Sequence, residues 1–113
     1  MLPDVTRGIE IGDALDWRIH TRVLGLPAND AACKPYSSDM ALAWPLVVII
    51  RNRGYWFALE EITSDGNQTW CANFDSSERV FLLPVGCEPD FEGEGATPSE
   101  AICRAVLNAV AER

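Results

Sequence analysis

The chain has 113 residues, of which 48% are hydrophobic and 23% are charged, so it is expected to fold as one domain rather than stay disordered. Its formal net charge is −8 and its basic residues are scattered, which argues against binding a nucleic-acid phosphate backbone. The apolar run Leu46–Ile50 is too short to cross a membrane. We therefore expect a single domain over residues 1–113 with neither a nucleic-acid nor a membrane partner.

The first residues show no signal-peptide pattern, so we expect a cytoplasmic protein with a loose arm over residues 1–8 and a core over about residues 10–112. Its cysteines contain no C-x-x-C pair, and they stand at Cys33, Cys71, Cys87 and Cys103. Thiols of this kind stay reduced in a cytosolic protein. We expect four free thiols, no metal site and no cofactor.

The first predicted helix spans Ile11–Leu24. Its apolar residues recur at every fourth position and share one helix face: Ile11, Leu15, Ile19 and Val23. Gly25 can adopt the left-handed conformation that ends a helix, and Pro27 prevents its continuation. Asp16 and His20 lie four residues apart near the edge of this face, and we expect them to form a surface pair.

The segment Ser38–Asn52 carries conflicting signals. Ser37 is a good N-cap, and a helix beginning after it would be kinked at Pro45, which lacks a backbone N–H. The β-branched run Val47–Ile50 is instead typical of a buried strand. These residues alone favour helix and strand almost equally.

A strand is predicted to begin at Tyr55, because large apolar residues occupy every second position from there to Leu59. Tyr55, Phe57 and Leu59 would face the core, and Trp56 would point the other way. In such a strand the Trp56 side chain lies on the opposite face of the sheet from those of Tyr55 and Phe57.

Two more strands complete the expected sheet. Asp65-Gly66 indicates a hairpin turn within a loop over Thr63–Gln68, and the return strand is predicted over Thr69–Phe74. The third strand is predicted over Val80–Leu83. The segment Glu88–Gly95 is rich in acidic residues and glycine, and we expect it to be an exposed loop.

The last predicted helix has the clearest start signals. Thr97 and Glu100 form a capping box, and Pro98 occupies the first helical position. Its apolar residues form a broad face: Ala101, Ile102, Ala105, Val106, Ala109 and Val110. The small alanines would allow this helix to lie close to the sheet.

These motifs together resemble the phage ABA sandwich domain family. The segment Pro35–Asp39, followed by Ala43-Trp44 and an apolar stretch, is similar to the second-helix signature of that family. Gly54–Phe57, Trp70–Phe74 and Thr97–Ala105 agree with it in order. The resemblance implies a helix over residues 38–52 in an α+β fold. That fold is a single-domain α/β/α sandwich with about three antiparallel strands and helices on both faces, in a family with no settled activity.

The aromatic residues are the first candidates for a function. Trp44 and Trp70 are expected in the core, whereas Trp56 is expected on a more open face, where it would suit an oligomer contact. The candidate binding surface consists of Arg51, Arg53, Tyr55 and Trp56. Aromatic rings with adjacent cations are the pattern expected of a pocket for a planar ligand.

The other reactive residue types are better explained without catalysis. Helix capping accounts for Ser37 and Asp39. The acidic residues between Glu88 and Glu94 lack the spacing of a calcium loop. Cys33 lies beside Lys34 but has no histidine partner to act as a base beyond the single, distant His20. We therefore expect no catalytic residues.

We expect a non-enzymatic bacteriophage or prophage accessory protein that acts by binding in the host cytoplasm. The alternative is sequestration of a small host metabolite or nucleotide signal, and a small enzyme is less favoured. The partners considered are a second copy of the chain, contacting through Trp56, a host protein and a small molecule.

Overall fold

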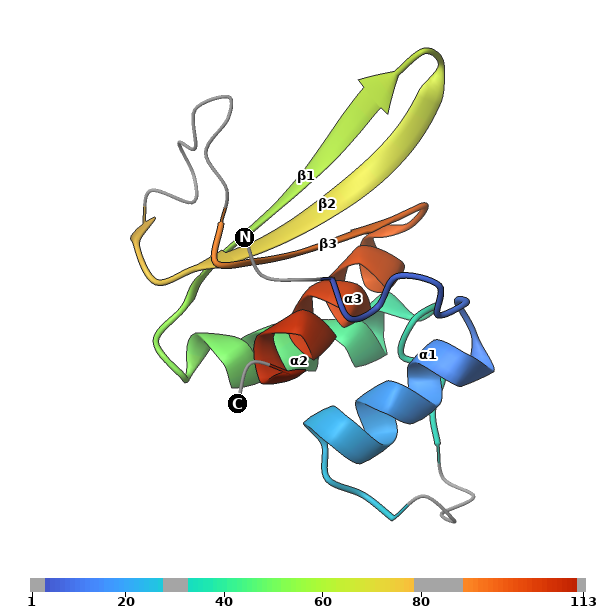
Figure 1. The fold of residues 1–113 in the computed structure, drawn as a ribbon, viewed down its shortest axis with the longest axis vertical. Coiled ribbons are helices and arrows are strands. Elements are labelled where there is room, and N and C mark those ends of the chain that lie inside the picture. The colour runs from blue at the N-terminus through green and yellow to red at the C-terminus, as the bar shows by residue number, and fades with distance from the viewer. Residues whose placement is uncertain (1–3, 28–32, 79–88, 112–113) are drawn as a thin grey trace.

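The computed structural model describes residues 4–27, 33–78 and 89–111, which form one α+β globule (Figure 1). Its elements in chain order are α1 (Asp13–Arg18), the π-helical turn η1 (Ile19–Val23), α2 (Met40–Arg51), β1 (Trp56–Ser64), β2 (Asn67–Asp75), β3 (Phe91–Gly95) and α3 (Pro98–Ala111). The strands form an antiparallel sheet in the order β1-β2-β3. The predicted α+β class and small antiparallel sheet are confirmed.

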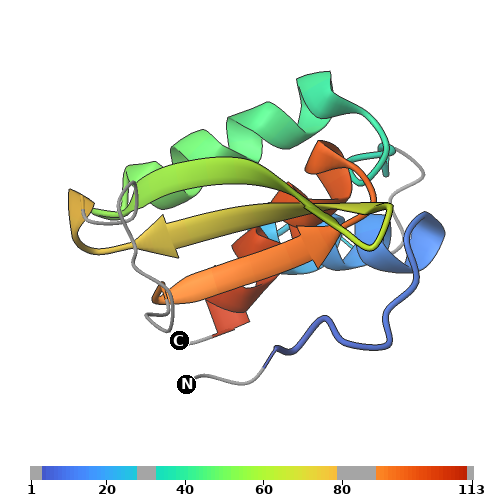
Figure 2. The same ribbon diagram turned by 90° about the horizontal axis from the view of Figure 1, so that it is seen from above.

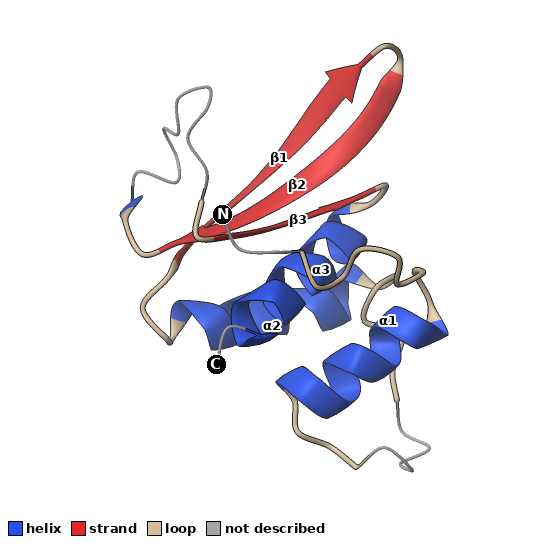
Figure 3. Cartoon of the chain, viewed as in Figure 1, coloured by secondary structure: helices blue, strands red, loops and turns tan. Residues whose placement is uncertain are grey.

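The helices of the described part of the chain lie on one side of the sheet (Figures 1 and 3). Helix α3 packs on β2 and β3, α2 lies beside α3 and reaches β1, and α1 packs on α3. Figure 2 shows the sheet in front of these helices. Among the residues that the structure describes, helices therefore cover one face of the sheet and not both faces as expected. The reason is that α3 is buried around most of its circumference, so α1 covers α3 instead of the sheet.

The hairpin between β1 and β2 is tighter than predicted. Ser64 pairs with Asn67, so the connection is the two-residue turn Asp65-Gly66, with φ of 52° and 80°. Positive φ at both positions matches the twist of the flanking strands, and Asp-Gly is a favoured sequence for such a turn. Both strands are consequently longer than expected.

The strand β3 lies in the segment that was expected to be an exposed acidic loop, and that expectation is wrong. Phe91 pairs with Phe74, and Gly93 pairs with Ala72, so alternate residues of the acidic segment face the helices. A Cβ at Gly93 would overlap the backbone nitrogen of Ala105. Glycine thus permits the close approach of α3. The strand predicted over residues 80–83 lies outside the described residues.

Residues 40–51 form a helix, as predicted, and not a strand. Its N-cap is Asp39, whose carboxylate accepts a hydrogen bond of 3.0 Å from the Ala41 N–H, rather than Ser37. The helix continues through Pro45. Its buried face consists of Ala43, Leu46, Val47 and Ile50. Tertiary burial of this face therefore outweighs the strand preference of its β-branched residues.

The first helix ends as predicted, since Gly25 has a φ of 67° and the Leu26 N–H bonds to the His20 carbonyl. The expected surface pair of Asp16 and His20 is wrong, because both side chains are buried. Asp16 Oδ1 accepts a 2.7 Å hydrogen bond from the backbone N–H of Ser37. His20 Nε2 lies 3.1 Å from the carbonyl oxygen of Pro27.

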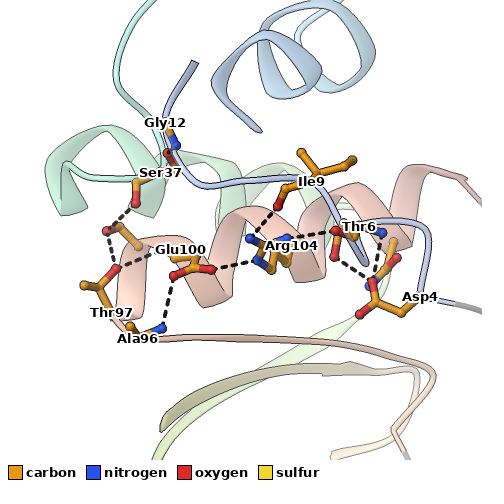
Figure 4. Close-up of polar contacts among 11 residues, drawn as sticks. Asp4, Thr6, Ile9, Gly12, Ser37, Ala96, Thr97, Glu100 and Arg104 are labelled. Carbon is orange, nitrogen blue, oxygen red and sulfur yellow. Dashed lines mark hydrogen bonds and ion pairs between the residues drawn. The ribbon is translucent and has the colours of Figure 1, made fainter. Parts of the chain in front are cut away.

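Residues 4–9 form a strap along α3 rather than part of a loose arm (Figure 4). Arg104 donates hydrogen bonds of 2.8 Å and 2.7 Å to the carbonyl oxygens of Thr6 and Ile9. Its Nε donates to Glu100 at 2.9 Å. Thr6 is fully buried. We call residues 4–9 the N-terminal strap.

The start of α3 follows the predicted capping pattern in part. The Glu100 N–H donates to Thr97 Oγ1 at 3.2 Å, as in a capping box. The Glu100 carboxylate accepts from the Ala96 N–H at 3.1 Å instead of from Thr97. It thus joins the helix start to the guanidinium that holds the strap (Figure 4).

Candidate functional site

A groove lies where α2 ends and β1 begins. Gly54, with a φ of 100°, reverses the chain between these two elements. The groove has a volume of about 490 Å³ and is lined by Val48, Arg51, Asn52, Gly54, Tyr55 and Trp56. This volume lies within the range of roughly 300–1,000 Å³ that is usual for small-molecule sites.

Three of the four predicted binding residues meet at this groove. Arg51 comes from the last turn of α2, and Trp56 is the first residue of β1. Tyr55 is half-buried, with its ring 5.4 Å from that of Phe91 in an edge-to-face contact. Arg53 is exposed but is not among the residues that line the groove.

An exposed apolar surface continues from the groove along α2. Val48 is 46% exposed, Trp44, one turn earlier, is 49% exposed, and Trp56 is 40% exposed. The Trp44 ring contacts Phe57 edge-on, with 5.9 Å between ring centroids. The expectation that Trp44 lies in the core is therefore wrong, whereas Trp70 packs against the core. We call Trp44, Val48, Arg51 and Trp56 the aromatic face.

The predicted surface includes three residues of the groove but lacks Trp44 and Val48 of the aromatic face. Arg51, Tyr55 and Trp56 are near neighbours in the sequence, so they were found together. Trp44 and Val48 lie four residues apart in a largely apolar helix. Their shared position on the outer side of α2 follows from where Ala43 and Val47 are buried.

The charges at the groove are positive. Neither Arg51 nor Arg53 forms an ion pair within residues 4–27, 33–78 and 89–111, and no acidic residue lines the groove. This surface therefore differs from the chain as a whole, which carries a net charge of −8. It is suited to a partner that is apolar or negatively charged.

Two cysteines of the described chain have no reactive character. Burial, together with the neighbouring Glu92 and Glu94, raises the pKa of Cys71 to about 12. Burial also raises the pKa of the Cys103 thiol well above its usual value. Both thiols stay protonated near neutral pH and are poor nucleophiles.

The acidic residues near β3 have structural partners. Asp90 accepts a hydrogen bond from the Ser76 N–H and donates its own N–H to Asp75. In the part of the chain that the structure covers, no group of three or more histidine, cysteine and acidic side chains is arranged to hold a metal ion. Among the same residues, no helix is long and apolar enough to span a bilayer.

No protein-family model, curated protein or solved structure matches this chain. The resemblance to the phage ABA sandwich family therefore stays an expectation from the sequence. The groove and the aromatic face are the features of the described chain that bear on its function.

Proposed function

We propose that the protein acts by binding and that the aromatic face is its contact surface with a partner protein. One observation carries this proposal: Trp44, Val48 and Trp56 are each 40–49% exposed, and Val48, one helical turn from Trp44, lines the groove together with Trp56. Exposed tryptophans together with an arginine are typical of the centres of protein interfaces. In the setting that the sequence resemblance implies, this is a phage or prophage accessory protein in the host cytoplasm.

The partner that fits this face is a second copy of the chain. Two copies that each carry a net charge of −8 repel one another, and the repulsion is smallest where the contacting surfaces lack acidic residues. The groove lining contains none. A twofold dimer would bring the two apolar surfaces together, and such dimers are the commonest assembly of soluble proteins.

Light scattering after size-exclusion chromatography, over a range of protein concentrations, tests this assembly. The wild type should have the mass of a dimer, and Trp56→Glu should have the mass of a monomer. Circular dichroism should show that this variant is folded. The matched control is Ile62→Glu, on the same strand and 43% exposed, which should remain dimeric. A wild type that is monomeric at high micromolar concentration contradicts the proposal.

A second candidate function, binding of a small planar anion, is favoured by the groove itself. An indole ring and a guanidinium in the lining of one groove suit a heteroaromatic ring that carries a phosphate. A nucleotide panel in a thermal-shift assay should then raise the melting temperature, and the parent nucleosides should do so less. Arg51→Gln should abolish this difference between nucleotides and nucleosides in the melting-temperature shift. Arg53→Gln should preserve the difference.

One variant separates the two candidates. Trp44 belongs to the aromatic face but does not line the groove. Trp44→Gln should therefore weaken dimer formation and leave nucleotide binding unchanged. Undiminished dimer formation in this variant would exclude Trp44 from the contact surface.

A further inference from the structure

We propose that a second pocket, separate from the aromatic face, binds an amphipathic anion with an apolar tail. The pocket lies between the N-terminal strap, the last turns of α3 and the α1–η1 helix. It has a volume of about 580 Å³ and is lined by Val5, Thr6, Ile9, Arg18, Arg22, Leu107, Val110 and Ala111. We call it the strap pocket.

One wall of the strap pocket is held in place by polar contacts. Arg104 binds the carbonyl oxygens of Thr6 and Ile9 (Figure 4). The side chain of Asn108 accepts a 2.9 Å hydrogen bond from the Val5 N–H and donates a 3.0 Å bond to Asp4. These bonds fix the strap backbone without filling the pocket, which reduces the entropy that a ligand must lose to bind.

The lining gives the pocket an apolar interior. Ile9 and Val110 are half-buried, and Leu107 is almost fully buried. Val5 is 46% exposed although both of its neighbours on the strap are hydrogen-bonded. An exposed apolar side chain in the lining of a pocket of this volume is suited to contact with a hydrocarbon tail.

Two arginines give the pocket its charge. Arg18 and Arg22 lie four residues apart, so they project from the same side of the α1–η1 helix. Both are exposed, and neither has an ion-pair partner among the described residues. No acidic residue is in the lining, and the neighbouring Asp4 carboxylate is bound by Thr6 and Asn108.

The combination selects the ligand chemistry. A neutral hydrocarbon would leave the arginines unused, and a small inorganic anion would leave the apolar walls in water. A carboxylate or phosphate head on an apolar tail meets both requirements, because an arginine pair recognises the head and burial of the tail adds the hydrophobic term. This inference does not depend on the proposed dimer.

Isothermal titration of the full chain with decanoate, decyl phosphate and decanol tests the pocket. The two anions should bind, and decanol should bind about tenfold more weakly or not at all. The double variant Arg18→Gln/Arg22→Gln should remove this preference for the anion. The matched control is Arg51→Gln/Arg53→Gln, which removes the same charge elsewhere and should bind as the wild type does.

A second variant tests the position of the site without removing an arginine. Ala111 is exposed and lines the pocket, so Ala111→Glu should weaken decanoate binding with little effect on folding. Binding of neither anion, or binding that the arginine and Ala111 variants leave intact, overturns the proposal.

The source of the anion needs a separate arm of the experiment. Vesicles of phosphatidylglycerol and of phosphatidylcholine present the same tails with anionic and zwitterionic heads. Sedimentation with the first vesicles only, lost in the double arginine variant, would assign a lipid as the source. Decanoate binding without vesicle binding would assign a free amphiphile.

Discussion

Ser99, in the first turn of α3, donates a hydrogen bond of 3.0 Å from its hydroxyl to the carbonyl of Ser37, which lies 62 residues earlier. Ser37 also donates its N–H to Asp16, and its hydroxyl accepts from the Gly12 N–H at 3.2 Å. A single buried serine thus joins the start of α1, the approach to α2 and the start of α3. Polar contacts, as well as apolar packing, set how these helices meet.

Removal of the Asp16 carboxylate should destabilise the protein. Asp16→Ala leaves the buried Ser37 N–H without its acceptor, at a cost of about 1–3 kcal/mol in the free energy of unfolding. Urea denaturation followed by circular dichroism measures this change. Asp13→Ala, in the same helix but exposed, is the control and should change the stability little.

Addition of one methyl group at Gly93 should also be costly. Gly93→Ala places a Cβ against the backbone of α3, with the Ala101 carbonyl oxygen only 2.6 Å away, and backbone cannot easily move aside. We expect a loss of about 1–3 kcal/mol. At Gly95 the nearest atoms to an added Cβ belong to the side chain of Glu100, at 2.8 Å, and not to backbone, so Gly95→Ala should cost less. Equal losses in the two variants would contradict the close packing of β3 on α3.

Replacement of Pro45 should stabilise the protein. The proline is exposed inside α2 and cannot donate a hydrogen bond to the Ala41 carbonyl. Pro45→Glu restores that donor, and we expect a gain of up to about 3 kcal/mol, visible as a higher melting temperature. The control is Ala41→Glu, an exposed substitution in the same helix that restores no bond. A melting temperature that Pro45→Glu leaves unchanged or lowers would show that the proline costs α2 nothing.

The buried thiols should make the protein less stable in alkali. Burial raises the pKa of Cys71 from its usual 9.0 to about 12 in the folded chain, so between these values the unfolded chain loses the proton and the folded chain keeps it. Its stabilising contribution is complete below about pH 9 and is lost as the pH rises toward 12. Urea denaturation at a series of pH values from roughly 8 to 11 measures this decline in the free energy of unfolding. The decline should be smaller in Cys71→Val.

Some elements could be predicted because their signals are local. The capping residues of α3, the left-handed Gly25 and the alternation from Tyr55 each depend on a few adjacent residues. The groove was predictable for the same reason, since Arg51 and Trp56 are separated by only one short turn. Such features need no knowledge of distant packing.

Other elements could not be predicted because distant residues determine them. Glu92 and Glu94 make β3 appear to be a loop in the sequence, and its strand character depends on Phe91 and Gly93 facing a helix that comes later. The burial of Asp16 depends on Ser37. The strap pocket combines residues 5–22 with residues 107–111, and no local pattern connects them.

The contacts between the N-terminal strap and α3 have a consequence for the order of events during synthesis. Asp4 and Asn108 are 104 residues apart in the sequence. Arg104, which binds the carbonyl oxygens of Thr6 and Ile9, is 98 and 95 residues from them. On the ribosome the N-terminal strap would therefore emerge before its partners and stay undocked until α3 has been translated. Because α3 also packs on β2, β3, α2 and η1, the nascent chain has no complete core before that point. Folding of this domain is therefore expected to be a single late event that its last helix triggers.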